Sequence, residues 1–450
     1  MSKIILVNPK TTQRELFPSG ALLLLGTILN KAGHKVKVIH ESADGYENRE
    51  ELLEYINSCM PDIVGITVTT FNCKSARDLC YSIKRQMPKV IVAVGGPHTS
   101  ALGREGVMYP PEADIWIVGE GDEIILDIAE GRIKNGIHFP EQLPNLDKTP
   151  VLDFSLTDIR RFPGTYPPGK LPSMFVLGSR GCPYNCTFCS RSVFGKTFRS
   201  RKPEVVVEET EKTIKDFGVK EVFFHDDAFN LNHEWAYELL GLLRKRGLHK
   251  KAIFRTPCRV NKRLVTEDLL REMKATNFWL IFFGAESGNS EMLKSMKKDI
   301  TVSEITRAFH LCHKAGIKSE ASFIIGMPGE NLQTIRDSEK LWRNIKPYWS
   351  SFSRAIPFPG TELYKTVKEK GHLLIDDFEE YGINEMIVRT DELDGSALEK
   401  EAQRLDKLVM REKVTNLLKT HPDRLVRVAM ERLKEKKRKK QRGKSNEKVH

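Results

Sequence analysis

The sequence predicts an α/β protein with two successive parallel sheets and a helical C-terminal extension. Two series of short β-rich apolar runs alternate with amphipathic stretches, the first over residues 3–131 and the second over residues 173–371. This alternation is typical of parallel strands joined by helices. The chain of 450 residues is 40% hydrophobic and 29% charged. That composition supports a buried core and argues against collagen-like, disordered and disulfide-scaffold proteins.

The first series predicts a doubly wound, Rossmann-like sheet of five strands over residues 1–138. Its expected strands are KIILVNP, KVKVIH, DIVGITVT, KVIVAVGG and DIWIVGEG. Helices are expected around 20–32, 49–59, 74–86, 100–108 and 122–130. A ligand of such a sheet binds at the carboxyl ends of the strands. A proline-rich stretch with weak periodicity, residues 139–172, predicts a linker.

The second series predicts an incomplete (β/α)6 barrel over residues 173–371. Its strands are expected in SMFVLGSR, EVFFHDD, KAIFRTPCRV, FWLIFFGAESG, KSEASFIIGMPGE and SSFSRAIPFPG. Reactive groups of such barrels lie at the carboxyl ends of the strands. Residues 372–450 are expected to form a helical C-terminal extension with a basic tail, and the helix itself is predicted from Asp391 to about Lys436. Apolar residues recur there at helical spacing, at Leu405, Leu408, Val409, Leu417, Leu418, Leu425 and Val428.

The net charge of +12 is concentrated in a C-terminal tail. Residues 423–450 hold 12 Lys and Arg against 4 Asp and Glu, a net +8, which leaves +4 for the rest. We expect a solvated basic end, with contact to an acidic membrane surface as the alternative, and we do not expect nucleic acid as a partner. The N-terminus has no signal-peptide pattern and no apolar stretch is long enough to cross a membrane, which predicts a cytoplasmic protein. The eight cysteines are then thiols or metal ligands rather than disulfides.

The strongest chemical signal is the run GSRGCPYNCTFCSR, directly after the first barrel strand. It places Cys182, Cys186 and Cys189 in a C-x3-C-x2-C array. Three thiolates from one tight loop suit a [4Fe–4S] cluster better than zinc, because structural zinc takes four ligands and no nearby residue supplies the fourth. Zinc remains the alternative. A cubane with three cysteine ligands leaves one iron open to a small molecule that carries an amine and a carboxylate.

This loop resembles the C-x3-C-x-aromatic-C loop of the radical S-adenosylmethionine superfamily, with Phe188 in the aromatic place. The resemblance implies that S-adenosylmethionine binds the open iron and that Phe188 lies near its adenine. One electron from the cluster would then give a 5′-deoxyadenosyl radical. An electron donor such as flavodoxin or ferredoxin is implied as a partner.

Later strand ends also match the superfamily. FFHDDAFN places Asp226 and Asp227 where the resemblance implies a contact to the methionyl amine, and CRVN places Arg259 where it implies a grip on the methionyl carboxylate. GAESG contributes Glu286 as a further cofactor contact and, with IIGMPGE and PFPGTELY, resembles one large branch of the superfamily. Taken one at a time, these side chains could equally form structural ion pairs or helix caps.

Polar and glycine-rich turns follow three strands of the first series. The candidate cofactor contacts are Thr67, Thr69 and Thr70, Gly95 and Gly96, and Gly119, Glu120 and Gly121. Together with the barrel, these turns resemble the cobalamin-binding class of radical S-adenosylmethionine enzymes, which implies a bound cobalamin used as methylcobalamin. A D-x-H-x-x-G motif, which would supply a histidine to cobalt, is absent from the sequence. His98 is the nearest candidate, and we expect it to be a turn histidine.

The resemblance implies a methyltransferase that acts on an unactivated carbon. A cyclase or oxidase with the same cofactors is the main alternative, and a non-catalytic cobalamin-binding protein is less favoured. A methylthiotransferase would need a second cluster on Cys59, Cys73 and Cys80. We expect those thiols, like Cys258 and Cys312, to be structural. The sequence does not identify the substrate.

Overall fold

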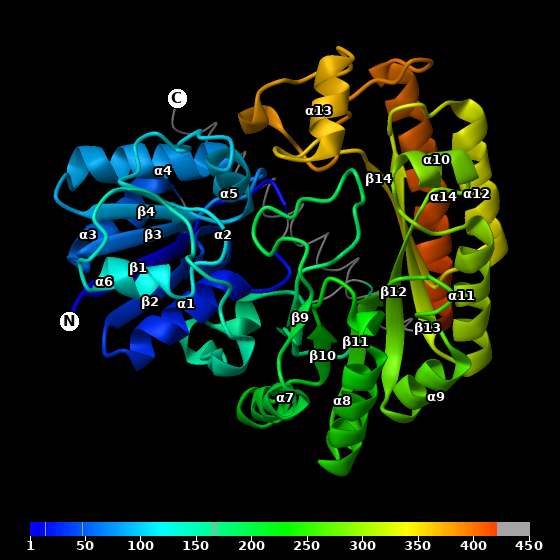
Figure 1. Cartoon of the computed structure of the whole chain (residues 1–450), viewed down its shortest axis with the longest axis horizontal. Coiled ribbons are helices and arrows are strands. Elements are labelled where there is room, and N and C mark those ends of the chain that lie inside the picture. Colours follow the sequence, from blue (N-terminus) through cyan, green and yellow to red (C-terminus); the bar gives the residue numbers. More distant parts are fainter. Residues whose placement is uncertain (14, 47, 165–166, 168, 421–450) are drawn as a thin grey trace, which may run out of the picture.

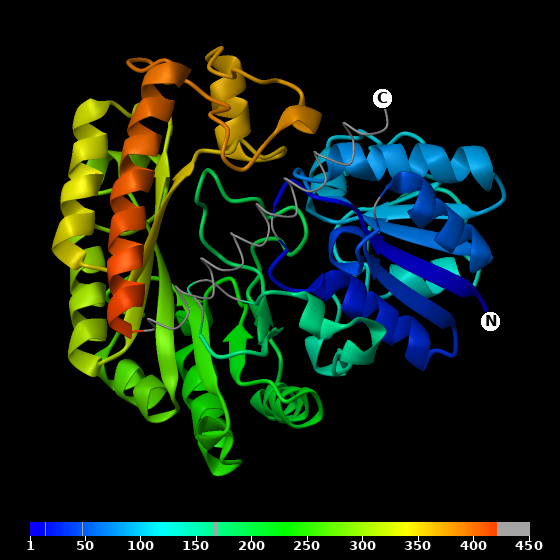
Figure 2. The same cartoon turned by 180° about the vertical axis from the view of Figure 1, so that it is seen from behind.

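The computed structural model describes residues 1–420 except 14, 47, 165–166 and 168. Two sheets form the two halves of the molecule, and each is covered by helices (Figure 1). The same arrangement seen from behind shows the longest C-terminal helix against the outside of the second half (Figure 2). The predicted positions Leu425 and Val428, and the basic tail, lie outside the described residues.

The first half is a parallel sheet with strand order β2-β1-β3-β4-β5-β6. Its strands are β1 Lys3–Asn8, β2 Lys35–His40, β3 Ile63–Thr67, β4 Ile91–Gly95, β5 Ile115–Ile117 and β6 Gly136–His138. Its helices are α1 Gly20–Lys31, α2 Glu41–Asp44, α3 Arg49–Ser58, α4 Cys73–Gln86, α5 Pro97–Gly103 and α6 Ile124–Ala129. The predicted class is confirmed, but the expectation of five strands is wrong. The sixth strand, GIH, is three half-buried residues at the edge, too short to produce an apolar run.

The stretch between the two halves contains three single 3₁₀ turns. They are η1 Leu146–Lys148, η2 Phe154–Leu156 and η3 Ile159–Arg161. In each, the side chain of the residue before the turn accepts a hydrogen bond from a backbone N–H within the turn. These acceptors are Asn145, Asp153 and Asp158. These caps satisfy backbone donors where no sheet or helix can.

The second half is an open parallel sheet with strand order β14-β13-β12-β11-β10-β7, so that β7 and β14 are its two edges. Its strands are β7 Ser173–Val176, β10 Glu221–Phe224, β11 Ile253–Cys258, β12 Phe278–Glu286, β13 Lys318–Ile325 and β14 Trp349–Arg354. Its helices are α7 Pro203–Phe217, α8 His233–Lys245, α9 Glu267–Ala275, α10 Ser290–Ser295, α11 Val302–Ala315, α12 Leu332–Ile345 and α13 Glu362–Glu369. Two further strands, β8 Ser179–Arg180 and β9 Arg199–Ser200, pair antiparallel. The predicted incomplete barrel is confirmed.

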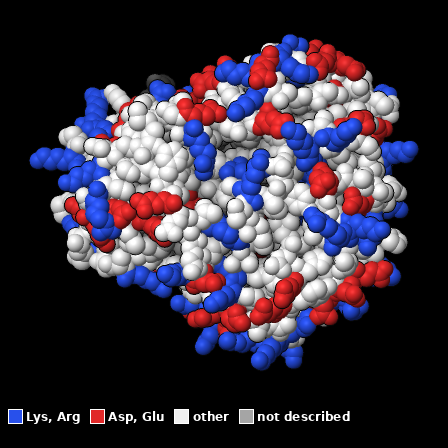
Figure 3. Space-filling view, viewed as in Figure 1, with Lys and Arg blue, Asp and Glu red and all other residues white. Residues whose placement is uncertain are grey.

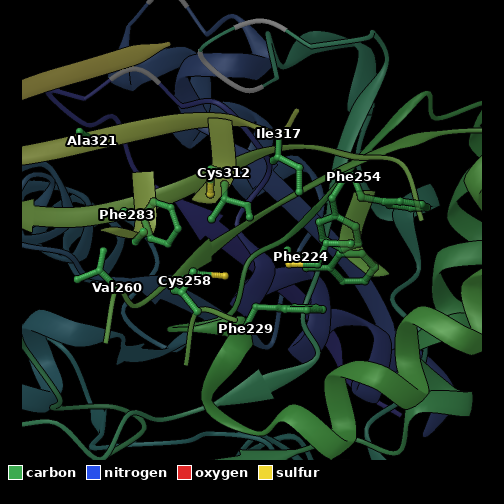
Figure 4. Packing of buried hydrophobic residues seen from close by; sticks show 14 of the residues in the cluster. Phe224, Phe229, Phe254, Cys258, Val260, Phe283, Cys312, Ile317 and Ala321 are labelled. Carbon is green, nitrogen blue, oxygen red and sulfur yellow. The ribbon is translucent and has the colours of Figure 1, made fainter. Parts of the chain in front are cut away.

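The core of the second half lies between its sheet and the surrounding helices. Phe224 and Phe278 stack with ring centroids 5.8 Å apart, and Phe254 packs against both. Figure 4 shows Cys258 and Cys312 within this packing. Both thiols are buried, as expected of structural cysteines.

The C-terminal extension is helical only in its second part. Residues 372–394 contain one isolated bridge, Leu373 to Val388, and one 3₁₀ turn, η6 Phe378–Glu380. The helix α14, Gly395–Thr420, then packs against β14. The predicted helical extension is confirmed, because helix was expected from about Asp391 and α14 begins at Gly395. No helix within the described residues is both long and apolar enough to cross a membrane.

Truncation of Phe278 should destabilise the barrel. Phe278 is fully buried among three other phenylalanines, so Phe278→Ala leaves a cavity that its neighbours cannot fill. We expect the free energy of unfolding to fall by about 3–5 kcal/mol, measured by urea denaturation. The matched control is Phe139→Ala, because Phe139 is 50% exposed. A change below about 0.5 kcal/mol is expected for the control, and an equal loss in both variants would contradict the assigned packing.

Candidate functional site

A cavity of about 390 Å³ lies between the two halves, where strand ends of both sheets meet. Its walls are mainly apolar, and it reaches both the glycine-rich turns of the first sheet and the cysteine loop of the second. Predicted contacts in its lining are Thr67, Gly95, Gly96, Gly119, Glu120, Gly121, Cys182, Cys189 and Asp227. On one face of the molecule, Lys and Arg side chains border the hollow between the halves (Figure 3).

The glycines let the backbone itself form the cavity wall. Gly96 has φ +108°, and a Cβ there would lie 2.7 Å from the carbonyl oxygen of Val68. Gly119 has φ +100° and donates its N–H to the Ser100 hydroxyl at 2.9 Å. A side chain at either position would strain its turn, and at Gly96 it would also collide with the backbone of Val68. A bare, apolar cradle of this kind fits a large flat cofactor such as a corrin.

The three predicted threonines separate in the structure. Thr67 lines the cavity, whereas the Thr70 hydroxyl lies 3.1 Å from His98 Nδ1 and the Thr69 N–H bonds the Asn72 side chain at 2.7 Å. The His98 ring packs edge-on against Tyr109 and Phe378, away from the cavity. Burial lowers the pKa of His98 to about 4. His98 is therefore a neutral, buried histidine in the first turn of α5, and Thr69 and Thr70 belong to the turn that follows β3.

The cysteine loop spans residues 181–198 and is closed at its base by β8 and β9. Gly181, at the start of the loop, has φ +86°, and a Cβ there would lie 2.3 Å from the Thr197 carbonyl oxygen at its end. Only glycine therefore allows the two ends to meet. Cys182 and Cys189 line the cavity, and Cys186 is buried behind them.

The thiols of this loop affect one another electrostatically. The pKa of Cys189 is raised to about 11, mainly by the removal of its thiol from water and also by the neighbouring Cys186, Asp227 and Cys182. Three thiolates this close need a strongly cationic centre to remain ionised. The donor set therefore fits an iron–sulfur cluster, whose irons would be held by Cys182, Cys186 and Cys189. Among the described residues, no three His, Cys, Asp or Glu side chains converge on a single metal ion.

Phe188 and Glu286 lie beside the same lysine. Lys298 Nζ bonds Glu286 Oε1 at 2.6 Å and lies 5.7 Å from the centroid of the Phe188 ring. Glu286 has φ +62°, and a Cβ on Gly284 would lie 2.2 Å from its Oε1, so Gly284 makes room for the pair. Sequence analysis missed Lys298. Lys298 stands in a lysine-rich run, KSMKKD, and this run matches no motif that indicates a functional residue.

Arg259 lies behind the cysteine loop. Its guanidinium is 3.4 Å from the centroid of the Tyr184 ring and 3.9 Å from Cys186 Sγ. Its Nε bonds the Asn261 side chain at 2.9 Å, and its Nη2 bonds the Lys298 carbonyl oxygen. Arg259 does not line the cavity, so its role toward a methionyl carboxylate remains a prediction.

The two adjacent aspartates point in different directions. Asp227 lines the cavity and accepts the Gly181 N–H at 2.9 Å. Asp226 is buried and accepts the Gly178 N–H at 2.9 Å and the Ser179 hydroxyl at 2.8 Å, while its other oxygen has no partner among the described residues. Burial raises the pKa of Asp226 to about 6. The structure thus brings Asp227 to the cofactor cavity and uses Asp226 to hold the chain before the cysteine loop.

Glu120 lies between Gly119 and Gly121 in the cavity lining, but its carboxylate is fully buried. It forms ion pairs with Arg180 and Arg199, on either side of the cysteine loop. Sequence analysis missed both arginines, because nothing in their local sequence indicates a partner from the other half of the chain.

The N-terminal cysteines behave as expected of structural thiols. Cys73 and Cys80 are buried, and Cys73 donates to the Phe378 carbonyl oxygen at 3.4 Å. Burial raises the pKa of Cys73 to about 11. Cys59 is half-buried, with its sulfur 3.6 Å from Lys37 Nζ.

Comparisons with known proteins agree with this architecture. Residues 11–129 match the B12 binding domain, and residues 176–341 match the radical SAM superfamily. An uncharacterized methyltransferase of Pyrococcus horikoshii is 29% identical over 84% of this chain and 86% of its own. The anaerobic magnesium-protoporphyrin IX monomethyl ester cyclase of Rubrivivax gelatinosus is 25% identical over 85% of this chain and 72% of its own.

A solved structure shares the fold of both halves. The radical S-adenosylmethionine methyltransferase TsrM from Kitasatospora setae superposes with a TM-score of 0.65 over 82% of this chain and 78% of its own, at 21% identity. The structure of that protein contains cobalamin and a [4Fe–4S] cluster.

Replacement of Asp226 should flatten the dependence of stability on pH. Its folded pKa of about 6 lies above the ordinary value of 3.8, so the folded state binds this proton more tightly and the free energy of unfolding falls as pH rises through this range. Asp226→Asn removes that titration. Between about pH 4 and pH 6.5, we expect the free energy of unfolding to decrease less in this variant than in the unmodified chain, by up to about 3 kcal/mol. The measurement is urea denaturation at each pH. An unchanged profile would contradict the assigned burial.

Proposed function

This chain belongs to the radical S-adenosylmethionine enzymes that carry a cobalamin-binding domain, and we propose that it methylates an unactivated carbon of its substrate. The observation that supports this best is the single cavity that joins the glycine-rich turns of the first sheet to Cys182 and Cys189 of the second. A methyl carrier and a radical source must act on one substrate in turn, so their sites must open onto a common space.

The residues of this chain would hold the cofactors and keep water away from them. Cys182, Cys186 and Cys189 would hold a [4Fe–4S] cluster, and the apolar cavity with Gly96 and Gly119 would hold cobalamin. Phe188, with Lys298 beside it, would contact S-adenosylmethionine, and Asp227 would pair with its methionyl amine. When bound, these cofactors supply a radical that abstracts hydrogen and a methyl group that replaces it.

The reaction also needs an external electron donor, because the cluster must be reduced before each radical is formed. We propose a small acidic redox protein such as a flavodoxin or a ferredoxin. The predicted cytoplasmic location is compatible with such a donor.

The proposed activity is tested by isotope transfer. The anaerobically reconstituted full chain with cobalamin, a reductant and S-adenosylmethionine bearing a CD3 methyl group is incubated with a small-molecule extract. We expect one compound to gain a CD3 group in place of hydrogen, together with equal amounts of 5′-deoxyadenosine and S-adenosylhomocysteine. The Cys186→Ser variant is the control. Formation of 5′-deoxyadenosine without any labelled product would overturn the proposal.

A cyclase or oxidase is the second candidate, and the similarity to the cyclase of Rubrivivax gelatinosus favours it. Both activities would start with the same hydrogen abstraction, so the cofactor sites do not separate them. A cyclase would form 5′-deoxyadenosine without stoichiometric S-adenosylhomocysteine, whereas a methyltransferase forms both.

Loss of one loop cysteine should abolish cluster binding. Cys186→Ser removes a buried sulfur ligand, so iron after anaerobic reconstitution should fall from about four atoms per chain to well under one, and cluster absorbance and 5′-deoxyadenosine should disappear. The matched control is Cys59→Ser, in which a half-buried thiol outside the loop is replaced. Iron content in Cys59→Ser should equal that of the unmodified chain. Full iron in Cys186→Ser would contradict the assignment.

A further inference from the structure

A buried ion cluster joins the cavity-lining turn of the first half to the cysteine loop of the second. The Glu120 side chain has no exposed surface, and its two oxygens accept hydrogen bonds from Arg180 Nη1 and Arg199 Nη2. Arg180 is also paired with Asp122 at 3.0 Å. Both carboxylates come from the turn between β5 and α6, and both guanidinium groups come from the second half.

The two arginines lie directly opposite each other at the base of the cysteine loop. Arg180 of β8 and Arg199 of β9 are partners in the antiparallel ladder that closes residues 181–198. Like charges in directly opposed positions repel, and burial strengthens the repulsion. Glu120 and Asp122 supply two negative charges against these two positive ones. The first half of the molecule thus supplies the negative charges that neutralise the base of the loop, while Asp227 of the second half holds the first residue of the loop, Gly181.

The residues of this ion cluster are adjacent in the sequence to backbone that lines the cavity and to the start of the cysteine loop. Glu120 lies between Gly119 and Gly121, which line the cavity. Arg180 is followed by Gly181, whose N–H is held by Asp227, and then by Cys182. A shift at the ion cluster would therefore move the cavity-lining turn and the first cysteine relative to each other.

We propose that Glu120 is a positioning residue that sets the distance between the cobalamin-side turn and the cluster loop. This role rests on the proposed cofactors and goes beyond contact with either of them. Reactions confined to the cluster side should not need Glu120, whereas any transfer between S-adenosylmethionine and cobalt should depend on it. A misplacement of about 1 Å can reduce such a transfer by up to about 100-fold.

The test separates these two kinds of reaction in one tube. Reconstituted full-length Glu120→Gln is given cobalamin, S-adenosylmethionine and titanium(III) citrate. In reductive cleavage, one electron from titanium(III) breaks the bond between sulfur and the 5′ carbon and leaves methionine and a 5′-deoxyadenosyl radical, which takes a hydrogen atom from citrate or another organic buffer component to give 5′-deoxyadenosine. In the transfer to cobalt, the electron pair of cobalt(I) forms the new bond to the methyl carbon while the pair of the S–C bond stays on sulfur, giving S-adenosylhomocysteine. We expect S-adenosylhomocysteine formation to fall about 10-fold or more and 5′-deoxyadenosine formation to change less than about 3-fold.

Two further variants separate positioning from general damage. Glu209→Gln is the matched control, because Glu209 is also fully buried and pairs with Arg201 at 2.8 Å, but within the second half alone. It should not change the ratio of the two products. Glu120→Gln combined with Arg199→Gln leaves one arginine facing Asp122 and should recover part of the lost transfer. An equal change of both products in Glu120→Gln, or the same selective loss in Glu209→Gln, would overturn the proposal.

A measurement on the protein without cofactors keeps this test independent of the proposed function. Hydrogen exchange should rise in Glu120→Gln at residues 118–123 and 179–181. It should stay unchanged at these residues in Glu209→Gln, because the partner of Glu209, Arg201, lies outside both segments. If the unmodified chain forms neither product, the proposed function fails and exchange alone decides the role of Glu120. Unchanged exchange in Glu120→Gln would overturn that role.

Discussion

The direction of the strands is the constraint on which this structure depends. All six strands of each large sheet run parallel, so the turns that follow them gather at one edge of each sheet. Those turns are the segments free to carry polar groups and glycines, because the central strands of the first sheet, β1, β3 and β4, are almost completely buried. The cavity forms where these two edges face each other, and this brings Gly96 near Cys182 although 86 positions separate them in the chain.

Facing edges of this kind cannot be joined by apolar packing alone, because strand ends and loop bases carry many unpaired backbone and charged groups. Some apolar contacts do cross the boundary, such as Phe71 against Phe358 with ring centroids 5.7 Å apart. Near the cysteine loop the contacts are polar. Arg104 donates to the Ser192 carbonyl oxygen at 3.0 Å, and the Ser192 hydroxyl donates to the Pro97 carbonyl oxygen at 2.9 Å. Directional contacts fix a relative position more narrowly than apolar surfaces do.

The sequence predicted the parts of the molecule that have a local signal. Apolar runs indicated eleven of the twelve parallel strands and failed for β6, which has three residues and no such run. Cysteine spacing identified the loop from residues only a few positions apart. By contrast, the partners of Arg180, Arg199 and Lys298 come from other strands or from the other half of the chain. Only the fold brings such charges together, so no spacing rule could have found them.

Local sequence also leaves open which way a side chain points, and the acids at the strand ends show why this matters. Asp226 and Glu330 follow β10 and β13, and both are buried acceptors of backbone N–H groups. Asp226 accepts from Gly178 in the segment after β7, whereas Glu330 accepts from Gly326 in its own loop. Burial raises the pKa of Glu330 to about 8 and that of Asp226 to about 6. Each carboxyl group thus loses its contact with water and forms hydrogen bonds that fix the position of backbone N–H groups instead. Such an acid is useful only if the loop it orders carries a function. Asp226 orders the chain immediately before Cys182, and its neighbour Asp227 is left to face the cavity. One strand end thereby supplies a group that builds the site and another that is open to a ligand.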